Sequence, residues 1–265
     1  MIQQETLPNG MRLWYAKPKA NGPRPAMVFL HERYGPVQHS MEVVERLADN
    51  GYVAVVPDMF HRYKGDRGAI ERAEARCDLN DNESLADLDN VMAWLRTHDY
   101  VRGGEIGIMG VCQTGREPIL YAAHRNDVAC IVVMNGGVYP REFVPAPGRP
   151  SSVSEWFPTL SCPVLGLFGE GDSLIPLENI ARFRSEMEQL RKSYQVRIFP
   201  GAPHGWINDT IPTRYRRGPA EEAWKTLLTF LGQTLGGDWD RTRVIWRFES
   251  DTSPDYDFSK NVMYG

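Results

Sequence analysis

One cysteine stands where the sequence predicts a reactive turn. Gly110-Val111-Cys112-Gln113-Thr114-Gly115 directly follows an apolar run, residues 105–109, that has the pattern of a buried strand. A residue held between small neighbours on a sharp strand-to-helix turn is the form of a nucleophile elbow. A helix N-terminus and a nearby imidazole both favour the thiolate. Cys112 is therefore a candidate nucleophile, and the alternative is a buried structural thiol.

Two later segments supply the groups that such a thiol needs. His204 follows a predicted strand, 196–199, on a loop beyond its carboxyl end, where ligands meet open α/β sheets. It would act as the base toward Cys112 and would later activate water. Asp172 follows the predicted strand 163–168 in a glycine-rich turn and would orient the imidazole. Glu170, two residues earlier, is its rival.

The loop after the first buried strand, His31-Glu32-Arg33-Tyr34-Gly35, contains further candidates. In enzymes with a nucleophile elbow, one oxyanion donor comes from this loop and the other from the residue after the nucleophile. We therefore predict the backbone N–H groups of Arg33 and Gln113 as the oxyanion hole. A carboxylate buried beside a thiol is costly without a partner, so Glu32 is either solvated or hydrogen-bonded within the site.

Short apolar runs alternate with amphipathic segments along the chain. This rhythm predicts an α/β fold with a mainly parallel, doubly wound sheet and helices on both faces. The expected strands are 26–30, 52–56, 105–109, 129–134, 163–168 and 196–199, and the expected helices are 41–49, 84–98, 179–191 and 219–231.

Two segments fall outside this rhythm. Residues 136–161 form a long, proline-rich and aromatic stretch, which is either a pocket wall or lid or a simple surface excursion. Residues 236–265 mix tryptophan, tyrosine and phenylalanine with many charges. We therefore divide the chain into one domain, 1–235, and a C-terminal extension, 236–265, that packs on the body or on a partner subunit.

The composition sets limits on partners and location. The 265 residues, 42% hydrophobic, can bury one large core, and the net charge of -4 gives no reason to expect nucleic-acid binding. The first six residues lack the basic and apolar segments typical of a secretion signal, and no apolar run has the roughly 20 residues that span a bilayer, so we expect neither feature. Its four cysteines are widely spaced, which indicates neither a disulfide framework nor a zinc site. We expect a cytoplasmic monomer or homodimer without metal or cofactor.

Taken together, these residues resemble the dienelactone hydrolase (carboxymethylenebutenolidase) family of the α/β-hydrolase superfamily. The resemblance covers roughly residues 25–235 and implies a Cys–His–Asp triad of Cys112, His204 and Asp172. It also implies that Glu32 contacts the resting thiol and helps to deprotonate it when substrate arrives. The matching motifs are His31-Glu32-x-x-Gly35, Pro57-Asp58-Met59-Phe60-His61-Arg62, Gly110-x-Cys112-x-x-Gly115, Asp172 and His204-Gly205-Trp206.

The chain departs from the family pattern at two positions. Thr114 stands in the elbow where glycine is common. Family members hold the substrate carboxylate with two arginines; Arg62 matches the first, but Asn208 stands at the position of the second. The predicted substrate-binding residues are Arg62, Tyr34, Trp206 and Tyr139, with Arg214, Arg216 or Arg217 as candidates to replace the second arginine.

A cysteine nucleophile restricts the chemistry. Thiolate leaves readily from a tetrahedral intermediate, so ordinary alkyl esters and amides would mostly revert, whereas an enol lactone or other activated ester releases a stabilised anion. We predict cofactor-independent hydrolysis of a small, anionic enol lactone or activated ester through an acyl-thioenzyme. The alternatives are a general carboxylesterase or thioesterase and a non-catalytic binding module of the same fold.

Overall fold

The central element is one mixed β-sheet. The structure is a computed structural model that describes residues 1–250. Within them, the sheet has the strand order β1-β2-β4-β3-β5-β6-β7-β8-β9. The strands are β1 (Gln3–Thr6), β2 (Arg12–Ala16), β3 (Arg24–Leu30), β4 (Val53–Pro57), β5 (Val101–Val111), β6 (Cys130–Met134), β7 (Val164–Gly171), β8 (Tyr194–Pro203) and β9 (Trp246–Ser250).

The middle of this sheet is parallel and buried on both faces. Strands β4, β3, β5, β6, β7 and β8 pair in parallel, while β1 and β2 form an antiparallel border next to β4. Every residue of β4 and β6 is buried, which explains why their sequences read as continuous apolar runs rather than alternating ones. The predicted strands are all present, and the borders β1, β2 and β9 are additions to them.

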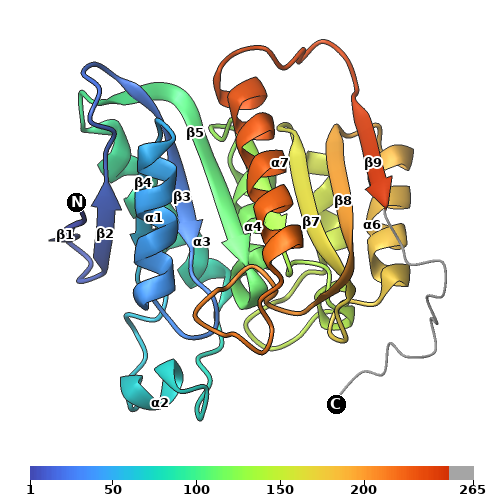
Figure 1. The fold of residues 1–265 in the computed structure, drawn as a ribbon, viewed down its shortest axis with the longest axis horizontal. Coiled ribbons are helices and arrows are strands. Elements are labelled where there is room, and N and C mark those ends of the chain that lie inside the picture. Colours follow the sequence, from blue (N-terminus) through green and yellow to red (C-terminus); the bar gives the residue numbers. More distant parts are fainter. Residues whose placement is uncertain (251–265) are drawn as a thin grey trace.

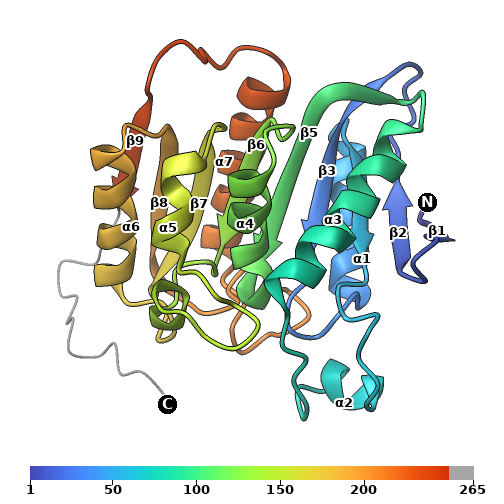
Figure 2. The same ribbon diagram turned by 180° about the vertical axis from the view of Figure 1, so that it is seen from behind.

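Helices cover both faces of the sheet. Figures 1 and 2 show α1 and α7 on one face and α3, α4, α5 and α6 on the other. Two hydrophobic clusters, one on each side, fill the space between sheet and helices. The helices are α1 (Gln38–Asp49), α2 (Arg67–Glu71), α3 (Asp81–Arg96), α4 (Glu117–His124), α5 (Val153–Trp156), α6 (Leu177–Gln189) and α7 (Arg217–Leu235), with short 3-10 turns at Cys112–Arg116, Pro140–Phe143 and Phe157–Thr159. The predicted doubly wound α/β fold is confirmed.

Residues 136–161 divide between two roles. The first part, around Tyr139 to Arg141, lines the cavity described below. The second part is not a surface excursion, because Val153, Trp156 and Phe157 are buried and the segment packs against α4.

The extension after α7 returns to the sheet as far as it is described. Trp239 is buried beside Phe230, with 5.6 Å between ring centroids. Strand β9 then pairs in parallel with β8, from Tyr194 opposite Trp246 onward. Residues 251–265, which complete the predicted extension, lie outside the described residues.

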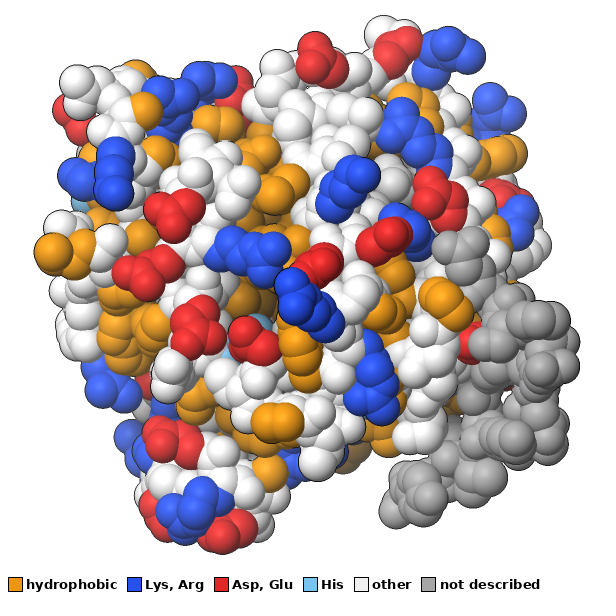
Figure 3. All heavy atoms as spheres, viewed as in Figure 1, with side chains coloured by type: hydrophobic (Ala, Val, Ile, Leu, Met, Phe, Trp, Pro, Cys, Tyr) orange, Lys and Arg blue, Asp and Glu red, His pale blue; other side chains and the backbone are white. Residues whose placement is uncertain are grey.

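No helix of residues 1–250 combines the length and apolar character that crossing a bilayer requires. On the face covered by α1 and α7, acidic and basic side chains are interspersed (Figure 3).

Candidate active site

Cys112 occupies a strained turn at the end of β5. Its φ of 54° lies in the left-handed region, which non-glycine residues adopt at a cost and which recurs at functional sites. The flanking glycines are required by close packing. A Cβ atom at Gly110 would lie 2.2 Å from the carbonyl oxygen of Thr114, and one at Gly115 would lie 2.6 Å from the backbone of Gly136. The Gly-x-Cys-x-x-Gly spacing is therefore a steric requirement of the elbow.

Three side chains from separate loops meet at this turn. His204 Nε2 lies 3.2 Å from Cys112 Sγ, and His204 Nδ1 lies 2.8 Å from Asp172 Oδ2. The rival carboxylate, Glu170, accepts a hydrogen bond from the Gly201 amide at 2.7 Å. The carboxyl ends of β5, β7 and β8 thus bring together the predicted nucleophile, acid and histidine, and Asp172 is the carboxylate that reaches the ring.

The charges of the hydrogen-bonded row Asp172, His204 and Cys112 favour a thiolate paired with an imidazolium. Burial raises the pKa of the Cys112 thiol, but the hydrogen bond and charge of His204 outweigh burial, so the pKa lies below its ordinary value. Burial would lower the pKa of His204, yet its bonds to Asp172 and Cys112 raise that pKa to about 10. Both pKa shifts favour the transfer of one proton from Cys112 Sγ to His204 Nε2.

Glu32 is buried and hydrogen-bonded within the site. Its Oε2 accepts a bond of 2.5 Å from Asn208 Nδ2, and both residues are almost fully buried. Asn208, at the position where the family has its second arginine, therefore provides a neutral amide donor to Glu32. The Cys112 thiol is hydrogen-bonded to His204, with the Tyr139 hydroxyl as a second polar neighbour, so the contact between Glu32 and the resting thiol stays a prediction.

His31 is a structural neighbour of this carboxylate. It is fully buried, and burial lowers the pKa of its ring to about 4, so the ring is neutral. His31 Nε2 accepts a bond from the Met59 amide at 3.1 Å, which leaves the proton on Nδ1 to donate to the Glu32 carbonyl at 2.7 Å. The ring therefore fixes the backbone of the loop that contains Glu32 and Arg33.

Thr114 joins that loop to the elbow. Its hydroxyl oxygen lies 2.9 Å from the His31 carbonyl and 3.0 Å from the Leu30 carbonyl, and it accepts a bond from the Val111 amide at 3.2 Å. A glycine at this position could not form these bonds. The departure from the family pattern thus has a structural function, because it ties the end of β3 to the turn after β5.

Cys112 and His204 open into a cavity of about 410 Å³, while Asp172 is buried behind the ring. Tyr139 forms part of its wall and donates a hydrogen bond from its hydroxyl to the Asn135 carbonyl at 3.0 Å. Gln113 is the second residue of the 3-10 turn, so its amide lies among the N–H groups that have no acceptor within the helix. The predicted site residues that line the cavity are Glu32, Arg33, Tyr34, Cys112, Gln113, Tyr139 and His204.

Two predicted substrate-binding residues lie elsewhere, which corrects the sequence-based assignment. Arg62 forms a bidentate ion pair with buried Asp87 and lines a different hollow. Trp206 is fully buried, and its Nε1 donates to Asn135 Oδ1 at 2.7 Å while its ring packs on Phe199. Arg62 therefore neutralises a core carboxylate, and Trp206 supports the turn that carries His204.

Other arginines surround the cavity instead. Of the three replacement candidates, Arg214 lines it, while Arg217 pairs with Glu221 on α7. Arg76 and Arg141 also line it, as does Arg33, whose guanidinium donates to backbone carbonyls. The sequence did not single out Arg76 or Arg141. For Arg141 the available signal is its position two residues after Tyr139 in the proline-rich segment.

Comparison with known proteins gives the family of this chain. The dienelactone hydrolase family profile matches residues 11–235. The chain is 28% identical over 237 residues to an Escherichia coli K12 protein named "Putative carboxymethylenebutenolidase", covering 86% of this chain and 84% of that protein. It is also 28% identical over 229 residues to a Bradyrhizobium protein named "Probable 2-oxo-3-(5-oxofuran-2-ylidene)propanoate lactonase", covering 85% of this chain and 91% of that one.

A solved structure supports the same conclusion. The crystal structure of a "Putative Dienelactone Hydrolase" from Klebsiella pneumoniae superposes with a TM-score of 0.79 at 26% identity, covering 88% of this chain and 98% of that chain. The fold and the elbow at the carboxyl edge of the sheet define an α/β-hydrolase. Because the family profile spans most of its length, the chain belongs to the dienelactone hydrolase family.

Proposed function

We propose that this hydrolase cleaves a small, anionic activated ester, with an enol lactone such as a dienelactone as its foremost substrate, through an acyl-thioenzyme on Cys112. The observation that carries the proposal is the hydrogen-bonded row of Asp172, His204 and Cys112 at the base of an open cavity. Of the four cysteines, all within residues 1–250, Cys112 is the one whose thiol pKa is lowered, whereas burial raises the pKa of Cys77 to about 11.

The proposed first half-reaction starts from the thiolate–imidazolium pair. The Cys112 thiolate attacks the carbonyl carbon, and the oxygen that becomes negative receives the backbone N–H groups of Arg33 and Gln113. Collapse of this tetrahedral intermediate breaks the bond to the ring oxygen and expels the enolate, which takes its proton from the His204 imidazolium. The products of this step are a thioester on Cys112 and a neutral His204.

The second half-reaction restores the pair. Neutral His204 removes a proton from water, and the resulting hydroxide attacks the thioester carbonyl. The second tetrahedral intermediate expels the Cys112 thiolate and releases the carboxylic acid product, while the proton stays on His204. Asp172 remains ionised throughout and holds the ring in the orientation that both steps need.

The preference for activated esters follows from the relative leaving groups. In the first intermediate either the thiolate or the substrate oxygen can leave. An alkoxide leaves less readily than the thiolate, so the intermediate reverts, whereas an enolate leaves more readily and the reaction proceeds. A thioester substrate also satisfies this balance, so thioesterase activity is the second candidate for the same site.

The arginines around the cavity support an anionic substrate. Arg214 and Arg33 both line the cavity, and neither is in an ion pair within residues 1–250. The lactone in the name of the Bradyrhizobium relative carries a carboxylate beside its enol-lactone ring. We assign the anchoring role to Arg214, assisted by Arg33, in place of Arg62.

The location of the enzyme is part of the proposal. All four cysteines lie within the described residues as free thiols. A cysteine nucleophile and the absence of disulfides among residues 1–250 both suit a reducing compartment, so we propose a cytoplasmic enzyme.

Mass spectrometry of the intact protein tests the proposal. Mixing the enzyme with a chromogenic activated ester should produce one covalent acyl adduct, and peptide mapping should assign it to Cys112. Cys112→Ala should abolish both adduct and turnover while leaving the thermal unfolding midpoint unchanged. Cys77→Ala is the matched control, because that thiol lines another hollow, and it should acylate normally.

The substrate class is tested on the same samples. An enol lactone should be hydrolysed with a kcat/KM far above that of a matched saturated lactone. Comparable rates for alkyl esters would favour a general carboxylesterase, and preference for thioesters would favour a thioesterase. Turnover that survives Cys112→Ala would contradict the mechanism, and no adduct with any activated ester would favour a non-catalytic module.

A further inference from the structure

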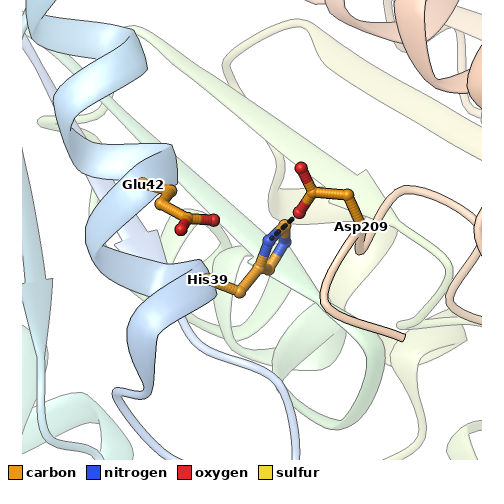
Figure 4. Close-up of side chains that lie close together, drawn as sticks. All are labelled: His39, Glu42 and Asp209. Carbon is orange, nitrogen blue, oxygen red and sulfur yellow. Dashed lines mark ion pairs between the residues drawn. The ribbon is translucent and has the colours of Figure 1, made fainter. Parts of the chain in front are cut away.

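Three side chains with metal-ligand chemistry meet outside the active site. His39 and Glu42 lie three residues apart on α1, so they share one face of the helix. Asp209 comes from the loop between β8 and α7. Figure 4 shows both carboxylates beside the His39 ring, in a hollow of about 260 Å³.

The distances fit ligands of one cation. One ligand atom from each of the three residues lies within 4.8 Å of the other two. His39 Nδ1 and Asp209 Oδ1 are 3.5 Å apart. Two ligands at the bond lengths of a tetrahedral zinc site are separated by about 3.4 Å. The exposed Glu42 side chain can close the remaining distance by rotation, because its stem is flexible.

One buried ring nitrogen of this cluster has no hydrogen bond within the described part of the chain. The His39 side chain is 9% exposed, and its Nδ1 has no hydrogen-bond partner within residues 1–250. The 3.5 Å separation from Asp209 is longer than a normal N–H···O bond. A buried ring nitrogen without a partner costs free energy that a cation would recover.

The local charge suits a divalent cation. Glu42 and Asp209 contribute two negative charges, and a neutral imidazole adds none. The nearest basic group lining the hollow, Arg46, stacks on the Trp224 ring at 4.1 Å. Glu221 also lines the hollow but is paired with Arg217. One histidine and two carboxylates suit Zn²⁺ or Mn²⁺ better than Ca²⁺, which takes oxygen ligands.

We propose that His39, Glu42 and Asp209 bind one divalent transition-metal cation, with water completing its coordination. The cation would join the start of α1 to the loop that follows β8. Both segments adjoin the cavity: α1 begins shortly after Tyr34, and Asp209 follows Asn208, which holds Glu32. The cation therefore links these two segments, at a distance from the Cys112 sulfur.

Zinc titration of the full chain tests this proposal. The parent protein should be Cys112→Ala, dialysed against a chelator, because the Cys112 thiolate is the competing soft ligand. Isothermal titration with zinc chloride should show one bound equivalent. Asp209→Asn and His39→Gln should each weaken binding at least tenfold. Glu45→Gln is the matched control, since it removes a carboxylate from α1 outside the cluster, and it should bind as the parent does.

Thermal unfolding supplies a second readout. Zinc at a hundredfold excess over Kd should raise the unfolding midpoint of the parent and of Glu45→Gln by about 5–10 °C. The midpoint of Asp209→Asn should rise by at most about half as much, because its binding is at least tenfold weaker. This variant is expected to fold because the Asp209 side chain is 59% exposed. A parent that binds no zinc, or an Asp209→Asn protein that binds zinc as tightly as the parent, would overturn the proposal.

Discussion

Replacing Asp172 by asparagine should make the Cys112 thiol less reactive, although the two side chains do not touch. The pKa of His204 rises from 6.5 to about 10, which corresponds to about 5 kcal/mol in favour of the protonated ring. Burial opposes this shift, and two partners, Asp172 and Cys112, produce it. A hydrogen bond between charged groups contributes about 1.5–3 kcal/mol, so losing the Asp172 carboxylate at roughly 2 kcal/mol should change the thiolate–imidazolium population about 30-fold.

Alkylation by iodoacetamide measures this population directly, because only the thiolate reacts. The other thiols interfere little, since burial raises the pKa of Cys77 to about 11 and that of Cys130 to about 12. At neutral pH, Asp172→Asn should react up to about 30-fold more slowly than wild type. Its rate should continue to rise at a pH where the wild-type rate has levelled, because the thiol loses the proton only at higher pH.

Two features make this experiment decisive. Asparagine can retain the bonds that Asp172 Oδ1 accepts from the amides of Leu174 and Ile175, so the turn should keep its shape. Glu170→Gln is the matched control, because Glu170 bonds the Gly201 amide and should leave the rate unchanged. An Asp172→Asn protein that alkylates at the wild-type rate with the same pH profile would refute the coupling between carboxylate and thiol.

Three further predictions concern side chains around the row. Arg214→Ala should raise KM about threefold to fivefold for a carboxylate-bearing ester and not for its neutral analogue; equal effects on both would remove its anchoring role. Arg62→Ala should leave that ratio unchanged but lower the free energy of unfolding by about 1–3 kcal/mol in urea titrations, because Asp87 loses a partner. Thr114→Val keeps the side-chain volume but loses the hydroxyl bonds, so it should cost about 1–3 kcal/mol by the same measurement, and unchanged stability would contradict the role of these bonds.

The parallel part of the fold could be predicted because burial on both faces leaves a clear sequence signal. The six predicted strands are mainly apolar runs, with charge only at Glu105 and Arg197, and all six are present. The edge strands leave a weaker signal. β1 is a polar segment with mostly exposed residues, and β9 has only exposed and half-buried positions, so neither differs from a loop by composition. β1 becomes a strand by pairing with its neighbour β2, and β9 by pairing with β8, which is distant in sequence.

The site was predictable where residue type and backbone position together restrict the chemistry. Cys112, His204 and Asp172 each follow a strand of a parallel sheet, and the carboxyl ends of such strands meet at one edge. The direction of a long side chain is not restricted in this way. Arg62 follows β4 closely, but Asp87, on a helix 25 residues later, attracts its guanidinium, and no local pattern reveals that pairing.

The pairing of β9 with β8 means that residue 235, where the family match ends, is not a physical boundary of the protein. A chain shortened at that residue would leave the ten-residue β8 with an unpaired row of backbone N–H and C=O groups. It would also uncover Phe230, which Trp239 now covers. Open strand borders of this length recruit further strands from other molecules, so such a truncated enzyme should self-associate even with its catalytic groups intact.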